Sequence, residues 1–271
     1  MFLTTDGATL HYEVRGSGPL LLVSQSGEGD ADRSTDLVGL LVDRYTVVTY
    51  DRRGLSRSTL AEAGQRVSMT QHADDVHRIL AELTAEPALM LGCSMGAAIG
   101  LHLAIAHPGQ LERLVAHDPV TPSLLPTGQR ERHLAELAHL QKAYRDGGLK
   151  AAFPEIARVL GIDPAHQETE PGLTPMPLTP RRLANFDFFI DRDFTAVAEA
   201  ELAPESLRAA PVRIIAACGS TTAPSAFVGQ CAQRLARLVG REAVAFPGGH
   251  NGNTTHPRAY AARLQDVLTR D

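Results

Sequence analysis

Short apolar runs alternate with segments of helical periodicity through the first part of the chain, and this alternation constrains the fold most. The runs are typical of strands buried on both faces. They are Leu20–Val23, Tyr45–Tyr50, Ala88–Leu91 and Leu111–His117. Ser68 and Gln71 form a capping box at the start of one intervening helix. Parallel neighbours need long crossovers, so this order predicts an α/β fold with a mostly parallel central sheet flanked by helices.

The pattern changes after residue 120. Gln129–Tyr144 predicts an amphipathic helix, and Gly161–Pro180 predicts a loop rich in proline and glycine. Strand patterns return only at Val212–Ala217 and Ala243–Phe246. We therefore predict one α/β domain that is interrupted by a helical insertion in the size range of a functional lid. The predicted division is core 1–120, cap 121–205 and core 206–271.

Composition excludes several classes of protein. Hydrophobic residues make up 44% and the net charge is only −5, so the bulk of the chain is not disordered. No basic run predicts a nucleic-acid partner, and no apolar stretch approaches the ~20 residues of a membrane helix. Three cysteines and the absence of a signal-peptide pattern predict a cytoplasmic protein without a disulfide framework. An exposed cap surface would suit a homodimer.

A serine flanked by glycines stands where a buried strand meets a helix, in Gly92-Cys93-Ser94-Met95-Gly96. A nucleophilic serine must project from a tight strand-to-helix turn, so the residues two before and two after it must be small. The Met95 N–H, at the start of the helix, can donate to an oxyanion. The alternative is a plain glycine-rich turn with a capping serine. The strand before Ser94 and the helix after it favour a nucleophile.

A serine hydroxyl needs a base before it can attack at neutral pH. His250 is the best placed of eleven histidines, because it lies in a glycine-flanked loop just after the last strand. The chain order, serine first and histidine last, also fits. His117, at a strand end, is the main competitor, whereas His107 and His256 occupy ordinary capping positions. No histidine spacing matches a metal motif, so we expect no metal.

With these features the sequence resembles the cap-bearing branch of the α/β-hydrolase superfamily over essentially the whole chain. Two further segments carry the resemblance: Thr49–Ser58, and Pro247–His250 followed by His256-Pro257. The resemblance implies an α/β-hydrolase fold whose helical cap is inserted after the sixth strand. It also implies a hydrolase that acts on a small-molecule substrate without a cofactor.

The acid that orients the histidine departs from the family's commonest pattern. It usually follows the strand that here ends at Ala217-Cys218-Gly219, but no Asp or Glu occurs from residue 206 to 241. Some family members carry the acid one strand earlier, where this chain has Asp118. That residue keeps the order serine, acid, histidine, although a turn-forming aspartate before a proline is the alternative. Other, less well placed candidates are Glu28, Asp191 and Asp193.

The loop after the first buried strand also departs from the family, which typically has His-Gly or Gly-Gly there. This chain has Ser24-Gln25-Ser26-Gly27-Glu28. Any residue but proline has a backbone N–H, so Ser26 or Gly27 is predicted to supply the second oxyanion donor. Gln25 could add a side-chain donor beside the substrate. The alternative is a plain turn between strand and helix.

Four of the eight phenylalanines lie between Phe186 and Phe194, inside the cap. Such a stripe is usually packing, but a small cap helix can also form one wall of a site. We therefore predict that Phe186 and Phe189 line an apolar acyl- or ring-binding pocket under the cap. A basic cluster in the preceding core is interpreted as a solvated or structural loop. Its members are Arg52, Arg53 and Arg57.

These residues together predict a serine hydrolase that cleaves an ester, thioester or lactone of a small, largely apolar molecule. Ser94 attacks the carbonyl, His250 takes its proton and Asp118 orients the imidazole. The same fold also hosts carbon–carbon hydrolases, cofactor-free peroxidases and cyclising or dehydrating enzymes, which form one alternative. A ligand-binding protein with little turnover is the other, because the usual acid is missing and the oxyanion loop is altered.

Overall fold

A nine-stranded sheet runs through the computed structural model, which describes residues 1–162 and 168–269. The predicted Gly161–Pro180 loop therefore includes five residues, 163–167, that lie outside the described part. The strand order is β1-β2-β4-β3-β6-β7-β8-β9, and the short β5 pairs with β2. The strands are β1 Phe2–Thr5, β2 Ala8–Arg15, β3 Leu20–Ser24, β4 Thr46–Tyr50, β5 Thr59–Leu60, β6 Ala88–Cys93, β7 Leu111–His117, β8 Arg213–Gly219 and β9 Val244–Phe246.

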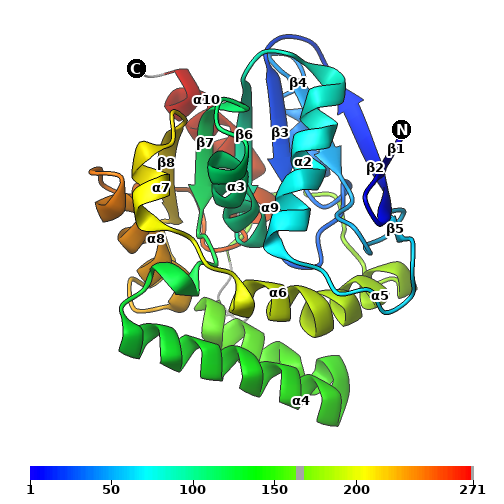
Figure 1. Ribbon diagram of the computed structural model, residues 1–271, viewed down its shortest axis with the longest axis vertical. Coiled ribbons are helices and arrows are strands. Elements are labelled where there is room, and N and C mark those ends of the chain that lie inside the picture. The colour runs from blue at the N-terminus through cyan, green and yellow to red at the C-terminus, as the bar shows by residue number, and fades with distance from the viewer. Residues whose placement is uncertain (163–167, 270–271) are drawn as a thin grey trace.

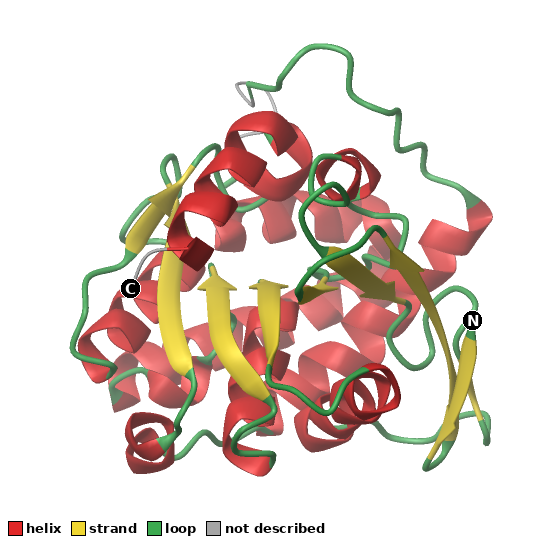
Figure 2. Cartoon of the chain, turned by 90° about the horizontal axis from the view of Figure 1, so that it is seen from above, coloured by secondary structure: helices red, strands yellow, loops and turns green. Residues whose placement is uncertain are grey.

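Helices cover both faces of this sheet (Figure 2). Helices α2, α3 and α8 contribute to the apolar core on one face, and α1 and α10 to the core on the other. The core helices are α1 Thr35–Gly39, α2 Met69–Leu83, α3 Met95–Ala106, α8 Phe227–Leu238, α9 Gly252–Thr255 and α10 Pro257–Thr269. The predicted capping box at the start of α2 is confirmed, because Ser68 and Gln71 bond each other's backbone N–H.

The parallel part of the sheet brings the carboxyl ends of six strands to one edge. These six parallel neighbours are β4, β3, β6, β7, β8 and β9, whereas β2 is antiparallel to both β1 and β4. All six residues of β6 are buried, as expected of a central strand covered on both faces. Loops at the carboxyl edge of a parallel sheet are where such folds place their ligands. This edge carries the candidate site.

Several of the helices that stand between β7 and β8 in the sequence lie against this carboxyl edge of the sheet (Figure 1). Strand β7 is the sixth strand of the chain when the two-residue β5 is left out. The described residues between β7 and β8 contain helical elements and no strand. They are the short turn η1 Pro122–Leu124, α4 Thr127–Leu160, α5 Pro180–Phe188, η2 Phe189–Asp193, α6 Phe194–Glu199 and α7 Pro204–Ala209. We keep the name cap for residues 121–205; the predicted boundary at 205 falls within α7.

Two elements differ from the sequence prediction. Phe2–Thr5 forms an edge strand that was not predicted, because four residues with only one buried side chain leave little periodicity. Helix α4 continues to Leu160, well beyond the predicted end at Tyr144. It accommodates a break at Gly148, where φ is 64° and ψ is −161°, so that it consists of two helical segments.

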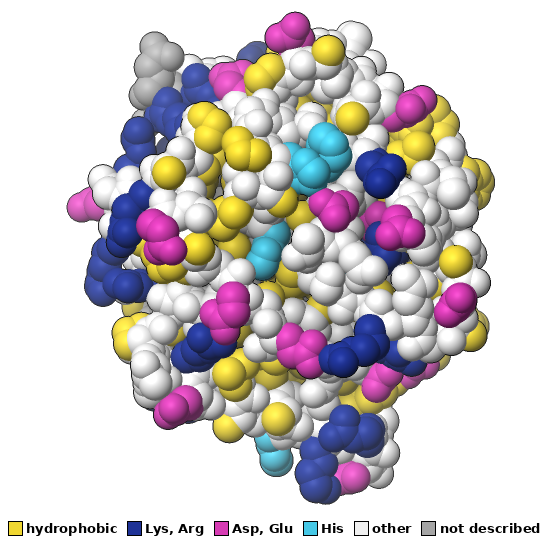
Figure 3. All heavy atoms as spheres, viewed as in Figure 1, with side chains coloured by type: hydrophobic (Ala, Val, Ile, Leu, Met, Phe, Trp, Pro, Cys, Tyr) yellow, Lys and Arg dark blue, Asp and Glu magenta, His cyan; other side chains and the backbone are white. Residues whose placement is uncertain are grey.

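Acidic and basic side chains are interspersed over the face of the molecule shown in Figure 3. Among the residues that the structure describes, every helix is too short or too polar to cross a membrane.

Two glycines allow α3 to begin directly against the sheet. A Cβ atom on Gly96 would lie 2.1 Å from the carbonyl oxygen of Ser24, and one on Gly92 would lie 2.5 Å from the carbonyl oxygen of Gly96. Further along the same helix, a Cβ on Gly100 would lie 2.6 Å from the side chain of Leu114. Real Cβ atoms do not approach other atoms so closely. Positions 92 and 96, where the new atom would meet backbone, therefore require glycine.

Replacing Gly96 by alanine is expected to lower the free energy of unfolding by about 3 kcal/mol or more, because the new methyl group would meet backbone that cannot move aside. Gly128 gives a matched control in α4, since a Cβ there would meet nothing within 4 Å. Gly128→Ala is expected to change stability by less than about 1 kcal/mol. Urea denaturation measures both values, and equal losses in the two variants would contradict the prediction.

Candidate active site

Ser94 lies at the junction of β6 and α3 with its backbone in an unusual conformation. Its φ is 55° and its ψ is −113°, in a region that side-chain-bearing residues rarely adopt. Its N–H donates to the carbonyl oxygen of His117 at 2.8 Å, which ties the turn to the end of β7. The side chain is nearly buried and lines a cavity beneath the cap. The flanking glycines predicted this tight strand-to-helix turn, from which the serine side chain projects into the cavity.

Asp118 and His250 lie together at the same edge of the sheet. The Nδ1 atom of His250 is 3.3 Å from Oδ2 of Asp118, a hydrogen bond slightly longer than the common range. Both side chains are buried. Asp118 follows β7 directly and has a φ of 44°, a left-handed conformation that aspartate tolerates better than most residues. Two predicted residues that lie 132 positions apart in the sequence are therefore in contact.

The loop after β8, where the family usually places its acid, supplies donors to Asp118. The hydroxyl of Thr222 donates to Oδ2 of Asp118 at 2.8 Å, and the N–H of Gly219 donates to Oδ1 at 3.3 Å. Sequence reasoning did not identify Thr222 as part of the site. The only signal was a run of hydroxyl residues, Ser220-Thr221-Thr222, where an acid is usual. The loop thus positions the carboxylate that it does not itself contain.

The environment of Asp118 favours its ionised form. Burial by itself would raise the pKa of the carboxyl group, but the imidazoles of His117 and His250 outweigh burial and hold that pKa well below its ordinary value. Burial also lowers the pKa of His117 to about 4, so its ring is uncharged at neutral pH. The hydrogen bonds from His250, Thr222 and Gly219 are then the contacts that favour the Asp118 charge near neutrality.

The candidate oxyanion loop, residues 25–28 after β3, is held by a buried arginine. The guanidinium of Arg52 donates to the carbonyl oxygen of Gln25 through Nη1 at 3.3 Å and to that of Gly27 through Nη2. A trans peptide is planar, with its C=O and N–H on opposite sides. Fixing the Gln25 carbonyl toward Arg52 therefore directs the Ser26 N–H away from it. Ser26 and Gly27 both line the cavity that Ser94 lines.

The same guanidinium reaches the cap. Nη2 of Arg52 lies 3.1 Å from Oδ2 of Asp193, and Oδ1 of Asp193 lies 3.1 Å from Nε2 of His72. All three side chains are buried. Arg53 is buried as well, with two hydrogen bonds to Asp75. The interpretation of this basic cluster as structural is right, but Arg52 and Arg53 are not solvated, because each has a buried carboxylate partner.

A cavity of about 530 Å³ lies beneath the cap, within the range of small-molecule sites. Its walls are mostly aliphatic and aromatic, and the predicted residues Phe186 and Phe189 are among them. Helix α4 supplies much of the remaining wall, a contribution that its sequence pattern did not indicate. Those α4 residues are Leu137, Leu140, Phe153, Ile156, Ala157, Val159 and Leu160. Ser94 and His250 lie on the same walls, so a bound molecule would contact both.

Other predicted positions lie elsewhere. Gln25 is buried outside the cavity wall, and its amide oxygen accepts from Ser34 at 2.8 Å. His107 pairs with Asp74 at 2.7 Å, away from the cavity. Of the alternative acids, Asp193 pairs with Arg52 as described, Glu28 pairs with Arg182 and Asp191 with Arg192. None of the three lies in a described hydrogen bond with His250.

The described residues contain no hydrogen bond between the Ser94 hydroxyl and the His250 ring, although both face the cavity. In unliganded enzymes this bond is often long and shortens when substrate binds. The nearby thiol of Cys93 does not compete as a nucleophile, because burial raises its pKa to about 12. The arrangement can therefore present one hydroxyl, one oriented imidazole and backbone N–H groups to a bound carbonyl.

Comparison with known proteins places this architecture in a family. The alpha/beta hydrolase fold family matches residues 19–167, and the chain belongs to this family. It is 35% identical to the uncharacterised hydrolase YraK of Bacillus subtilis over 273 residues, which span 99% of this chain and 96% of that protein. With a relative of that name along its full length, the chain is a hydrolase.

Solved structures share the fold over the whole chain. A hydrolase from Pseudomonas aeruginosa PA01 has a TM-score of 0.69 at 25% identity, with 100% of this chain and 98% of that chain covered. The enol-lactonase from Burkholderia xenovorans LB400 has a TM-score of 0.70 at 22% identity, with 100% of both chains covered. These likenesses extend across both the sheet and the cap helices.

His117 predicts how stability depends on pH. Its ring is fully buried between Phe246 and Tyr260, and neither ring nitrogen has a hydrogen-bond partner among the described residues. Its pKa falls from the ordinary 6.5 to about 4, so between these pH values the unfolded chain binds more protons than the folded chain. Stability is therefore retained above about pH 6.5 and lost as the pH falls toward 4.

Replacing His117 by phenylalanine is expected to remove about 3 kcal/mol of this loss in the free energy of unfolding over that window. Urea denaturation at about pH 7 and at about pH 4.5 measures the difference. His139→Gln on the exposed side of α4 is the control and should follow the wild type. A His117→Phe variant with the wild-type pH dependence would show that this ring is not the titrating group.

Proposed function

We propose that this protein is a serine hydrolase that cleaves an ester, thioester or lactone bond of a small, largely apolar molecule. The observation that carries the proposal is that Ser94, held on a strained turn, and His250, hydrogen-bonded to Asp118, line the same cavity. The order serine, acid, histidine along the chain and the mostly apolar cavity walls also support it. Acyl transfer needs these three groups and no metal or cofactor.

The first half-reaction forms an acyl-enzyme. The Ser94 hydroxyl attacks the substrate carbonyl while Nε2 of His250 takes its proton, and Asp118 holds the ring with Nδ1 protonated. The negative charge that develops on the carbonyl oxygen is stabilised by two backbone N–H groups, those of Met95 and Ser26. Ser26 is preferred to Gly27 because Arg52 fixes the carbonyl of the same peptide on the opposite side. The leaving group departs with the proton from His250.

The second half-reaction releases the acid. Water takes the position of the leaving group, gives a proton to His250 and attacks the acyl carbonyl, after which Ser94 regains its proton. Asp118 remains ionised throughout and stabilises the imidazolium that forms twice in each cycle. The buried setting strengthens that interaction, because water does not screen it.

Reaction with a fluorophosphonate tests whether Ser94 is activated. Intact mass spectrometry of the wild type is expected to show one adduct per chain, because the oxyanion donors stabilise the tetrahedral phosphorus. Ser94→Ala should give none. Ser225→Ala, at an exposed position after β8, should react like the wild type. An unlabelled wild type would remove the support for hydrolysis and favour a ligand-binding role under the same cap.

Replacing Asp118 by asparagine tests the acid. We expect kcat for an activated ester to fall by about 10³–10⁴-fold, with little change in KM, because the imidazole loses the carboxylate that sets its tautomer. Asp191→Asn is the matched control, since Asp191 is an exposed cap carboxylate without a hydrogen bond to His250. Steady-state kinetics of the two variants decide between them. A larger loss of kcat in Asp191→Asn than in Asp118→Asn would show that the assignment of Asp118 as the acid is wrong.

A further inference from the structure

One end of the cavity beneath the cap is charged, although the rest of its wall is apolar. Three ionisable side chains besides His250 line this end, namely Glu28, Arg33 and Arg182. They contribute two positive charges and one negative charge. Excess charge in a mostly apolar site is costly unless a bound group of the opposite sign compensates for it.

Arg182 has enough acceptors within the protein. One of its terminal nitrogens lies 2.7 Å from Oε1 of Glu28, and the other donates to the carbonyl oxygens of Met176 at 2.6 Å and Pro177 at 3.2 Å. This pairing uses the negative charge of Glu28. Arg182 is therefore a structural residue that holds the chain before α5 against the loop after β3.

Arg33 lines the same wall and faces the same carboxylate as Arg182, but it differs in its hydrogen bonds. Its guanidinium makes no hydrogen bond to any described residue, and its Nε is buried without a partner. The nearest carboxylate oxygen, Oε1 of Glu28, lies 3.7 Å from that Nε and is already bonded to Arg182. The Arg33 side chain is only 15% exposed. The buried Nε–H is thus left without an acceptor, and the four donors on the two terminal nitrogens have no partner among the described residues.

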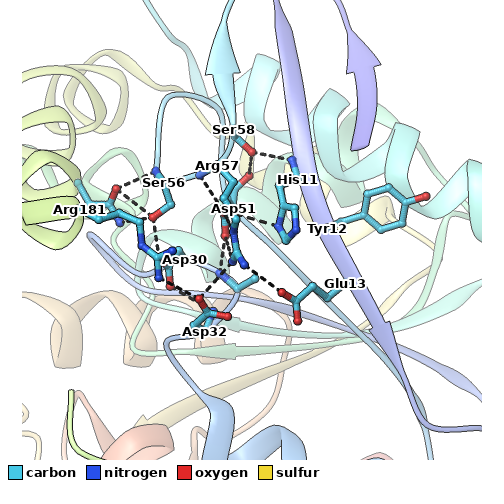
Figure 4. A network of polar contacts seen from close by, with 12 residues as sticks. His11, Tyr12, Glu13, Asp30, Asp32, Asp51, Ser56, Arg57, Ser58 and Arg181 are labelled. Atoms are coloured by element: carbon cyan, nitrogen blue, oxygen red, sulfur yellow. Dashed lines mark hydrogen bonds and ion pairs between the residues drawn. The ribbon is translucent and has the colours of Figure 1, made fainter. Parts of the chain in front are cut away.

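The acidic residues next to Arg33 in the chain do not neutralise it, because other partners use them (Figure 4). Asp30 accepts from the hydroxyl of Ser56 at 2.7 Å and faces Arg181. Asp32 lies 3.0 Å from Arg181 and 3.4 Å from Arg57. This network fixes the loop after β3 and leaves the positive charge of Arg33 to the cavity.

The loop that carries Arg33 also contacts the loop of the candidate base. Ser34 accepts a hydrogen bond from the side-chain amide of Asn253 at 2.9 Å, and Asn251, next to His250, lines the same cavity. Ser26 and Gly27 begin the same loop on the other side. Arg33 and Ser94 line the same cavity, so one molecule can contact both.

We infer that Arg33 recognises a carboxylate on the substrate, so that the preferred substrates are esters or lactones with an apolar body and one anionic group. This inference rests on the proposed function. A guanidinium can bind a carboxylate through two parallel hydrogen bonds, which suits both the charge and the unused donors of Arg33. The apolar body of the same molecule would occupy the wall formed by α4 and α5.

Two matched substrate pairs test the inference by kinetics. Mono(4-nitrophenyl) adipate is compared with 4-nitrophenyl hexanoate, and 4-acetoxybenzoate with 4-acetoxybenzamide, so that the charge lies on the acyl side or the leaving-group side. In the wild type we expect kcat/KM to favour the charged member of at least one pair by about tenfold or more. Arg33→Gln should lower the charged-to-neutral ratio of kcat/KM in that pair to about one.

Arg66→Gln is the matched control, because Arg66 is exposed, pairs with Glu199 in the cap and does not line the cavity. It should keep the wild-type preference. If the charged-to-neutral ratios are the same in the wild type and in Arg33→Gln for both pairs, the inference is wrong.

A binding measurement separates this inference from the hydrolase proposal. In the Ser94→Ala background, calorimetry should show 4-phenylbutyrate binding about tenfold or more tightly than 4-phenylbutyramide, and Arg33→Gln should remove the difference. If the binding preference is observed but the wild type hydrolyses no ester, only the proposed function is refuted. Ester hydrolysis without any charge preference in kinetics or binding would refute only the role of Arg33.

Discussion

The close contact between the first turn of α3 and the ends of β3 and β6 is the constraint on which the rest of the site depends. Gly92 and Gly96 allow backbone to meet backbone there, and Ser94 between them adopts its unusual φ as a result. The same contact brings the start of α3 beside Ser24, the last residue before the oxyanion loop. This packing places the Ser94 side chain and the first N–H groups of α3, and the hydrogen bonds of Arg52 then fix the loop that follows Ser24.

Charge within the site is distributed over three strand ends. The nucleophile candidate follows β6, the acid candidate follows β7, and the loop after β8 contributes Thr222 and the Gly219 N–H as donors to that acid. A carboxylate buried beside apolar rings would otherwise be unfavourable. The acid candidate follows β7, one strand earlier than is usual in the family. The loop after β8 therefore supplies a hydroxyl and an N–H to Asp118 instead of a carboxylate, and Asp118 bonds the His250 ring.

Sequence patterns identified those features whose physical cause is local. The strand Leu111–His117 was predictable because its own run of hydrophobic residues defines it. The Ser68 cap was predictable because its partner, Gln71, is only three residues away. The edge strand Phe2–Thr5 was missed because pairing, and not burial, defines it. The burial of Arg52 could not be predicted, since its partner Asp193 is 141 residues away and is brought near only by the cap. Likewise, the unused donors of a guanidinium are visible only when all its neighbours are in place.

The ion pair between Arg52 and Asp193 has a consequence for how the cap can move. Withdrawing η2 from the core would leave a guanidinium and a carboxylate buried or newly hydrated without each other, and breaking such a pair costs about 3–5 kcal/mol. The same guanidinium bonds the carbonyl oxygens of Gln25 and Gly27, so a buried ion pair links η2 to the loop after β3. Any opening of the cap that keeps this pair intact has to occur in other cap segments, and it would leave the backbone around Ser26 in place.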